Sequence, residues 1–169
     1  MGEKGEITIT IIDVMRKEDV DLVLAIEQAS FTMPWSRNLF LAEFRNRPVS
    51  LSLVALSGKT AAREVIGYFI SWVIEDEMHI LNLAVAAPFQ RQGIARRLVL
   101  AALKQAFTKG VRRVFLEVRE SNIAAHNLYS RLGFTPTFIR KHYYDMPLED
   151  AVVMTLEAAA YKSLIETEG

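Results

Sequence analysis

The segment from Leu81 to Leu103 is the feature of the sequence that most constrains the fold. An apolar run ends near Pro88, a short polar loop follows, and a helical repeat of apolar residues begins after Gly93. This order is typical of a strand, a tight loop and the first turn of a helix. The first N–H groups of a helix have no intrahelical partners, and the helix dipole is positive there. The segment therefore predicts an anion-binding site.

The charges beside this loop allow two interpretations. Arg91, Arg96 and Arg97 stand where cations are unfavourable for the helix itself, which favours a bound polyanion. Arginines on a first helical turn can equally be solvated, and the charges alone do not separate the two interpretations. Over the whole chain, 20 basic residues balance 20 acidic ones, so we expect no direct nucleic-acid partner and no membrane binding.

The remaining pattern predicts one mixed α/β domain over residues 1–157 and a helical or disordered tail over 158–169. We expect strands at residues 6–12, 49–56, 64–74, 78–85, 113–118, 134–140 and 151–157. We expect helices at 17–29, from Ser36 (with Leu39, Phe40 and Phe44 buried) to Pro48, at 93–109 and at 122–132, and a polar loop at 141–150. The order β-α-α-β-β-β-α-β-α-β-β predicts a twisted mixed sheet of six or seven strands flanked by helices.

Several classes of site and location are disfavoured. The chain has no cysteine, which excludes a disulfide framework, a thiolate metal site and a cysteine nucleophile. Its three histidines, His79, His126 and His142, show no metal-ligand spacing, so we expect no metal and interpret them as surface or hydrogen-bonded side chains. The N-terminus lacks the apolar core of a signal peptide, and no apolar run has the length of a membrane span, so we expect a cytoplasmic protein.

Three motifs together resemble a known family. The loop Gln90–Ala95 reads QRQGIA, residues 116–122 read LEVRESN, and residues 124–134 read AAHNLYSRLGF. This combination resembles the GCN5-related N-acetyltransferases (GNAT), and within them the RimI-like ribosomal-protein-alanine N-acetyltransferases. The loop of that family ends in Gly or Ala, and Ala95 is the permitted variant. Pro-Trp-Ser at 34–36, Arg140–Tyr144 and Glu149–Ala151 match the same branch.

The resemblance implies the GNAT fold and acetyl-CoA as co-substrate. It also implies transfer of the acetyl group to the N-terminal α-amine of a protein, in particular the N-terminal alanine of a small-subunit ribosomal protein. The partner would then be the N-terminal peptide of that acceptor; the oligomeric state is left open. Two alternatives remain: a lysine side chain or a small-molecule amine as acceptor, or a non-catalytic acyl-CoA-binding domain on the same fold.

The resemblance also implies roles for individual residues. Glu117 would be the general base and Tyr129 the general acid. The strand backbone would pair with the pantetheine arm at Leu83, Ala84 and Val85. The loop would hold the pyrophosphate through Arg91, Gln92, Gly93, Ile94, Ala95 and Arg96. Asn122 would contact the cofactor.

The chemistry requires such groups. The attacking amine must be neutral, and a carboxylate of ordinary pKa near 4 is a weak base unless burial raises that pKa or a water relays the proton. Because Glu117 lies on a mainly apolar strand, we expect its pKa to be raised. A tyrosine with a pKa near 10 is protonated at pH 7 and can protonate the leaving CoA thiolate. N–H groups near Val85 would polarise the thioester carbonyl.

Each candidate also has a structural interpretation. Glu117 could pair with Arg119 or Arg113, Tyr129 could be a core residue, and Asn122 could be only a helix cap. Tyr143 and Tyr144 could line a peptide site or cover the sheet, and Phe31 and Trp35 could pack in the core or form one wall of a groove.

Overall fold

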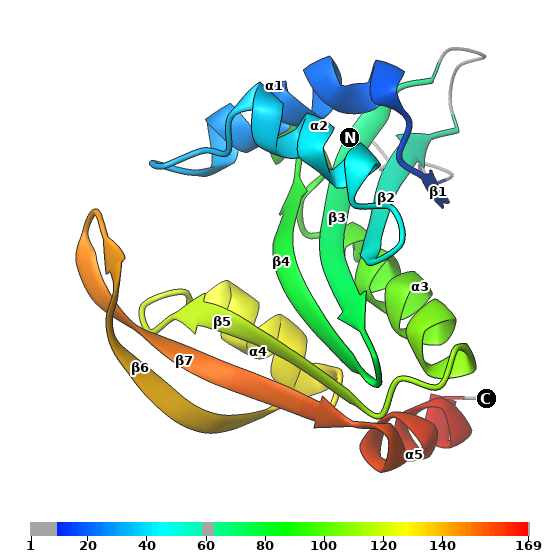
Figure 1. The fold of residues 1–169 in the computed structure, drawn as a ribbon, viewed down its shortest axis with the longest axis vertical. Coiled ribbons are helices and arrows are strands. Elements are labelled where there is room, and N and C mark those ends of the chain that lie inside the picture. Colours follow the sequence, from blue (N-terminus) through cyan, green and yellow to red (C-terminus); the bar gives the residue numbers. More distant parts are fainter. Residues whose placement is uncertain (1–9, 59–62, 169) are drawn as a thin grey trace, which may run out of the picture.

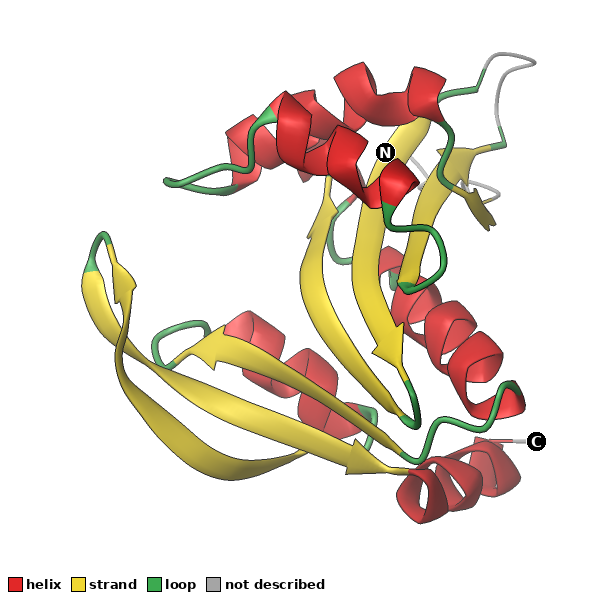
Figure 2. Cartoon of the chain, viewed as in Figure 1, coloured by secondary structure: helices red, strands yellow, loops and turns green. Residues whose placement is uncertain are grey.

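The protein is a seven-stranded sheet with helices on both faces (Figures 1 and 2), seen in a computed structural model that describes residues 10–58 and 63–168. The order of strands across the sheet is β1-β2-β3-β4-β5-β7-β6, and the predicted order of elements along the chain is confirmed. The strands are β1 (Thr10–Val14), β2 (Ser50–Ser57), β3 (Val65–Ile74), β4 (Glu77–Val85), β5 (Arg113–Arg119), β6 (Thr135–Asp145) and β7 (Leu148–Glu157). The helices are α1 (Val20–Ser30), α2 (Arg37–Arg45), α3 (Ile94–Thr108), α4 (Ile123–Arg131) and α5 (Ala158–Glu168), with short 3₁₀ turns η1 (Lys17–Asp19) and η2 (Ala87–Phe89).

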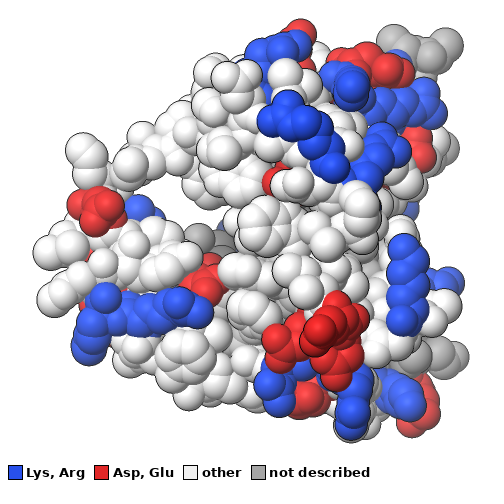
Figure 3. Space-filling model, viewed as in Figure 1, with Lys and Arg blue, Asp and Glu red and all other residues white. Residues whose placement is uncertain are grey.

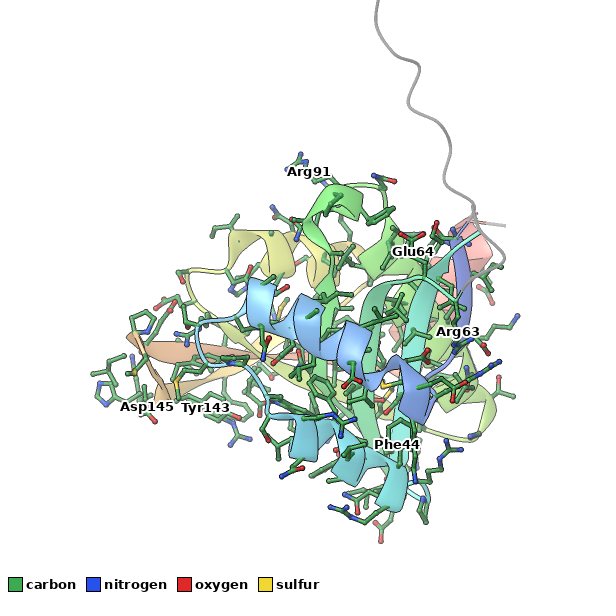
Figure 4. The ribbon with its side chains drawn as sticks, turned by 90° about the horizontal axis from the view of Figure 1, so that it is seen from above. Phe44, Arg63, Glu64, Arg91, Tyr143 and Asp145 are labelled. Atoms are coloured by element: carbon green, nitrogen blue, oxygen red, sulfur yellow. The ribbon has the colours of Figure 1, made fainter. Side chains whose placement is uncertain are left out.

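Two hydrophobic cores lie on opposite faces of the sheet. One holds α3 and α4 and includes Leu98, Leu103 and Leu132; the other lies under α1 and α2. Figure 4, which looks down on the molecule, shows the two pairs of helices separated in this way. Phe40 of α2 is fully buried and meets Tyr68 edge to face, but the expected burial of Leu39 is wrong, since its side chain is exposed.

Residues that cap helices in the sequence mark the ends of three helices in the structure. Ser36 accepts the N–H of Leu39 at 3.3 Å and so caps α2, as predicted. Gly110 and Gly133 follow α3 and α4 with φ of 93° and 87°, a backbone conformation that glycine adopts at little cost. The predicted strand at residues 6–12 falls partly outside the described residues, which begin at Thr10 within β1.

The predicted polar loop at 141–150 is wrong. β6 and β7 continue through it as an antiparallel hairpin that turns at Met146 and Pro147. The polar residues pair across the two strands: Lys141 Nζ lies 2.7 Å from a carboxylate oxygen of Asp150, whose other oxygen accepts the N–H of His142 at 2.8 Å. Polarity here reflects two exposed strand faces, which a hydropathy pattern alone does not separate from a loop.

The sheet splits between β4 and β5. These strands are parallel, and within the described chain they pair only through Glu77–His79 and Arg113–Phe115; beyond these residues they diverge (Figure 1). At the closed end Arg113 bridges Glu77 at 3.3 Å and Glu157 at 2.9 Å. Tyr161 of α5 stacks on Phe107 of α3 near this end, with ring centroids 4.5 Å apart. The split leaves an opening between two half-sheets.

Within the part of the chain that the structure describes, no helix combines the length and the apolar character needed to span a bilayer.

Candidate active site

A cleft of about 760 Å³ opens where β4 and β5 diverge, and Figure 3 shows the hollow at the left, between the two halves of the molecule. Both half-sheets line it. The lining includes Ile80–Leu83 of β4, Leu116–Arg119 of β5, Asn122 and Tyr129 at α4, and segments of the α1–α2 loop and of the β6–β7 hairpin. Its described lining residues include one basic side chain, Arg119, and four acidic ones: Glu27, Glu117, Asp145 and Glu149.

The α1–α2 loop and the tip of the β6–β7 hairpin meet over the cleft. Thr32 Oγ1 donates to the carbonyl of Met146 at 3.3 Å. Arg119 donates to the carbonyls of Met146 and Pro147, each at 3.1 Å, and its guanidinium lies 4.1 Å from the centre of the Tyr144 ring. These contacts hold the hairpin tip against β5 and the loop.

The aromatic residues left open by the sequence are now located. Tyr143, Tyr144 and Phe31 line the cleft, and Figure 4 shows Tyr143 beside Asp145 at the hairpin tip. Trp35 combines the two roles considered for it, a wall of the groove and a packing residue. It lines the cleft and also packs on Phe40 with ring centroids 5.5 Å apart.

Glu117 projects from β5 into the cleft, where its side chain is 7% exposed. Its Oε2 lies 2.6 Å from Nε2 of His79 and its Oε1 lies 3.3 Å from Nη2 of Arg140. Neither Arg113 nor Arg119, the partners considered from the sequence, makes this contact: Arg119 pairs with Glu149 instead.

The electrostatic consequence contradicts the sequence prediction. Burial acts to raise the pKa of Glu117, as expected, but the hydrogen bond and the charge of His79, with the charge of Arg140, outweigh it. The net pKa of Glu117 is therefore below its ordinary value. The strand context predicted the burial correctly, and the sign of the shift differs because His79 and Arg140, which oppose the effect of burial, come from other strands.

His79 is a site residue that sequence reasoning missed. It was interpreted as a surface or hydrogen-bonded histidine, and it is hydrogen-bonded, but its unforeseen partner is Glu117; its ring also stacks on Phe115 with centroids 4.4 Å apart. The only sequence feature that relates His79 to Glu117 is its position. His79 of β4 lies opposite Phe115 of β5, and Phe115 precedes Glu117 by two residues. That relation is readable only once β4 and β5 are known to be adjacent.

Tyr129 and Asn122 each combine a structural position with a place in the cleft. Tyr129 is 6% exposed and meets Phe134 edge to face, with centroids 5.3 Å apart. Burial, with a smaller contribution from Tyr144, raises the pKa of Tyr129, so its hydroxyl stays protonated at neutral pH. Asn122 Oδ1 accepts the N–H of Ala125 at 3.1 Å and caps α4, which leaves its amide N–H₂ available to a ligand.

The predicted pyrophosphate loop, Arg91–Arg96, does not line this cleft. It lies at the N-terminus of α3, and Figure 4 shows Arg91 pointing outward there. Gly93 is the N-cap residue with φ of 78°, and it supplies no side-chain cap to the first turn. Arg97 donates to the carbonyl of Thr10 at 2.7 Å, so its side chain joins α3 to β1. Of the three predicted strand residues, Leu83 lines the cleft, while Ala84 and Val85 are buried.

These features fit a long ligand with an amide-containing arm and a diphosphate. Backbone groups of β4 beyond His79 have no pairing partner on β5 within the described chain, so they are available to an extended ligand. The same strand leads through η2 to the uncapped N-terminus of α3, a favourable position for phosphate. Among the described residues, no group of three or more histidine, aspartate or glutamate side chains is arranged to hold a metal ion.

The chain belongs to the GNAT acetyltransferase family. The family model described as "Acetyltransferase (GNAT) family" matches residues 20–134, which include β4, the loop, α3, β5 and α4. The matched residues thus include both strands that diverge at the cleft and the helix that follows β4.

The similar proteins are more specific. A Haemophilus ducreyi protein named ribosomal protein bS18-alanine N-acetyltransferase is 35% identical over 149 residues, 86% of this chain and 99% of that protein. The crystal structure of the Escherichia coli ribosomal-protein-S18-alanine N-acetyltransferase superposes with a TM-score of 0.79 and 32% identity, covering 88% of this chain and 94% of that one. The structure of Ard1 from Thermoplasma volcanium also gives a TM-score of 0.79, with 28% identity and coverage of 88% and 97%.

Proposed function

We propose that this acetyltransferase transfers the acetyl group of acetyl-CoA to the N-terminal α-amine of a protein, and that its acceptor is an N-terminal alanine of a ribosomal protein. The observation that carries the proposal is that one cleft gathers Leu83, Glu117, Asn122 and Tyr129 from both half-sheets. The bS18-alanine acetyltransferases, which are about as long as this chain and similar over most of it, support the choice of acceptor. Such an acceptor implies a cytoplasmic protein.

The donor would be held by β4 and α3. Bound acetyl-CoA supplies an acetyl group activated as a thioester. The backbone of Leu83–Val85 offers hydrogen bonds to its amide arm, and the first-turn N–H groups after Gly93 offer hydrogen bonds to its diphosphate. The open N-terminus of α3 makes Gly93, Ile94 and Ala95 the main contributors, with Arg91 as an exposed charge beside them.

The acceptor amine would approach from the cleft. The excess of acidic side chains in its lining attracts an ammonium group. An α-amine of pKa near 8 is roughly one-tenth neutral at pH 7, whereas a lysine amine is neutral at only a few parts in ten thousand. A base of modest strength therefore suffices for an N-terminus. Glu117 takes the proton from the amine, and Tyr129, protonated at neutral pH, donates to the departing thiolate.

The proposal is tested by incubating the protein and acetyl-CoA with a peptide that begins with alanine and carries one internal lysine. Mass spectrometry identifies the acetylated amine. We expect modification of the α-amine only, and none when the N-terminus is blocked. Acetylation of the lysine in the blocked peptide would assign the enzyme to side-chain acceptors, and absence of any transfer across a panel of N-termini would overturn the proposal.

The residue roles are tested separately. Glu117→Gln and Tyr129→Phe should each lower kcat by about 100-fold, the usual contribution of a positioned acid or base. Binding of acetyl-CoA, measured by calorimetry, should change little, because neither side chain is needed to hold the arm or the diphosphate. Glu18→Gln on η1 and Tyr161→Phe on α5 are matched controls outside the cleft. Undiminished turnover in either cleft variant would remove that residue from its role.

A further inference from the structure

The carboxylate of Glu117 is held at both oxygens by other strands. His79 of β4 contacts Oε2 at 2.6 Å and Arg140 of β6 contacts Oε1 at 3.3 Å. An ionised carboxylate can only accept hydrogen bonds, so Nε2 of His79 carries the hydrogen and donates it. Glu117 lines the cleft and His79 does not, so Glu117 is the member of the pair that meets a substrate.

The surroundings of the pair leave few other charges to act on it. The His79 ring stacks on Phe115 and lies opposite Trp72 of β3, whose indole N–H is itself bonded to Glu43 of α2 at 2.9 Å. On the far side, Tyr143 and Tyr144 of β6 and Arg140 face Glu117. Arg140 is permanently charged, and both tyrosines have a raised pKa and remain neutral below pH 9. Among these neighbours, the imidazole is the one that can be either neutral or positively charged while it keeps its contact with Glu117.

Two effects of His79 on Glu117 follow from this geometry. The N–H donor fixes the orientation of the carboxylate in either charge state of the ring. A positive charge on the ring, in contact with the carboxylate, makes Glu117 a weaker proton acceptor. The first effect operates at every pH, and the second is present only when the imidazole is protonated.

We propose that His79 is a positioning residue that orients Glu117 for catalysis and, by its own protonation, reduces the basicity of Glu117 as the pH falls. This inference rests on the proposed function, in which Glu117 accepts the proton of the acceptor amine. No proton needs to pass to the ring: the amine N–H bond breaks, the proton is bound by the Glu117 carboxylate and is then released to solvent.

Two substitutions separate the donor from the charge. His79→Gln retains an N–H donor at about the reach of Nε2 but cannot become charged, and His79→Asn is a shorter alternative should the glutamine variant be unstable. His79→Phe retains the ring stacked on Phe115 and loses both donor and charge. His126→Asn is the matched control, because its Nε2 contacts only the backbone carbonyl of Arg119, at 3.1 Å, and the side chain lies outside the cleft.

The experiment measures kcat between pH 6 and 8.5 and expresses each variant relative to the wild type, which cancels the titration of the acceptor amine. For His79→Gln we expect a ratio near one at pH 8.5 that rises on the order of threefold to tenfold by pH 6. For His79→Phe we expect at least a tenfold loss at pH 8.5, and for His126→Asn a ratio near one throughout.

The outcomes separate the effect of the ring charge from the positioning effect of the N–H donor. A flat ratio for the asparagine and glutamine variants would overturn the role of the ring charge, and full activity of His79→Phe would overturn the positioning role. Without substrate, the pH at which the NMR signals of the His79 ring shift should change in Glu117→Gln; no change would contradict the pair in solution. Failure of the wild type to acetylate any N-terminus would instead refute the proposed function and leave the NMR result standing.

Discussion

Replacement of Glu27 should destabilise the protein through the hydrogen-bond donors that it leaves behind. Glu27 of α1 is 1% exposed and accepts from three groups: the N–H of Trp35 at 2.7 Å, the amide of Asn82 at 3.0 Å, and the hydroxyl of Tyr68. All three donors are uncharged. The carboxylate thus joins the α1–α2 loop to β3 and β4 on one wall of the cleft.

The magnitude follows from which donors lose their partner. In Glu27→Leu the backbone N–H of Trp35 is partly exposed and can bond to water. The buried Tyr68 hydroxyl can donate to Asn82 Oδ1, 3.2 Å away, whereas the buried Asn82 amide N–H loses its acceptor. A buried donor without a partner costs about 1–3 kcal/mol, and Tyr68 exchanges a charged acceptor for a neutral one, so the free energy of unfolding should fall by about 3 kcal/mol. Tyr68→Phe removes the contacts of the hydroxyl with Glu27 and with Asn82 Oδ1 and leaves the Glu27 carboxylate two other donors, which should cost about 1.5 kcal/mol.

A double-mutant cycle measured by urea unfolding checks the reasoning. The double variant Glu27→Leu/Tyr68→Phe should be less destabilised than the sum of the single variants by about 1–2 kcal/mol, because both single variants lose the same Tyr68–Glu27 hydrogen bond. Glu18→Leu, at a side chain that is 68% exposed, is the control and should stay within about 0.5 kcal/mol of the wild type. Additive effects, or a loss below about 1 kcal/mol for Glu27→Leu, would refute the account of this network.

Three further predictions concern the backbone, the charge and the tail. Gly93→Ala should cost about 1 kcal/mol, measured by urea unfolding, because φ is 78° but an added Cβ meets no atom within 4 Å; a loss above about 3 kcal/mol would contradict this. The lowered pKa of Glu117 stabilises the fold above pH 4.5 and ceases to do so as pH falls through the folded-state value, so Glu117→Gln should lose less stability than the wild type between pH 6 and 3; equal losses would contradict the pairing with His79. Tyr161→Ala should lower stability by about 3 kcal/mol through its stacking on Phe107, and an unchanged melting temperature would mean that α5 does not dock in solution.

Much of the fold was predictable because local chemistry and global structure agree. The apolar periodicity of α3, the cap at Ser36 and the glycines after α3 and α4 each marked an element that the structure contains. The hairpin β6–β7 was divided into strand and loop because both faces of its outer part are polar. Leu39 was misassigned because a stripe of apolar residues on α2 does not tell which of them meets the neighbouring helix.

The site was less predictable because it depends on pairing between strands. Motifs indicated Glu117, Asn122 and Tyr129, and the structure places all three on one cleft. The residues that contact Glu117, His79 and Arg140, lie on separate strands and carry no local signal of this role. For that reason the expected rise in the pKa of Glu117 has the wrong sign: burial can be estimated from a strand pattern, but partners from other strands cannot.

Because β4 and β5 pair through only three residues each within the described chain, a small rotation at this pairing displaces the far ends of the two half-sheets. From His79 to Val85, β4 extends about 20 Å at about 3.3 Å per residue, so a rotation of about 3° at the ladder moves the far end of the strand by about 1 Å. A misplacement of this size is enough to slow a reaction about 100-fold. The ion pairs of Arg113 and the contact of α5 with α3 lie at the paired end of β4 and β5, away from the cleft. Residues that line no part of the cleft thus influence how its two walls are aligned.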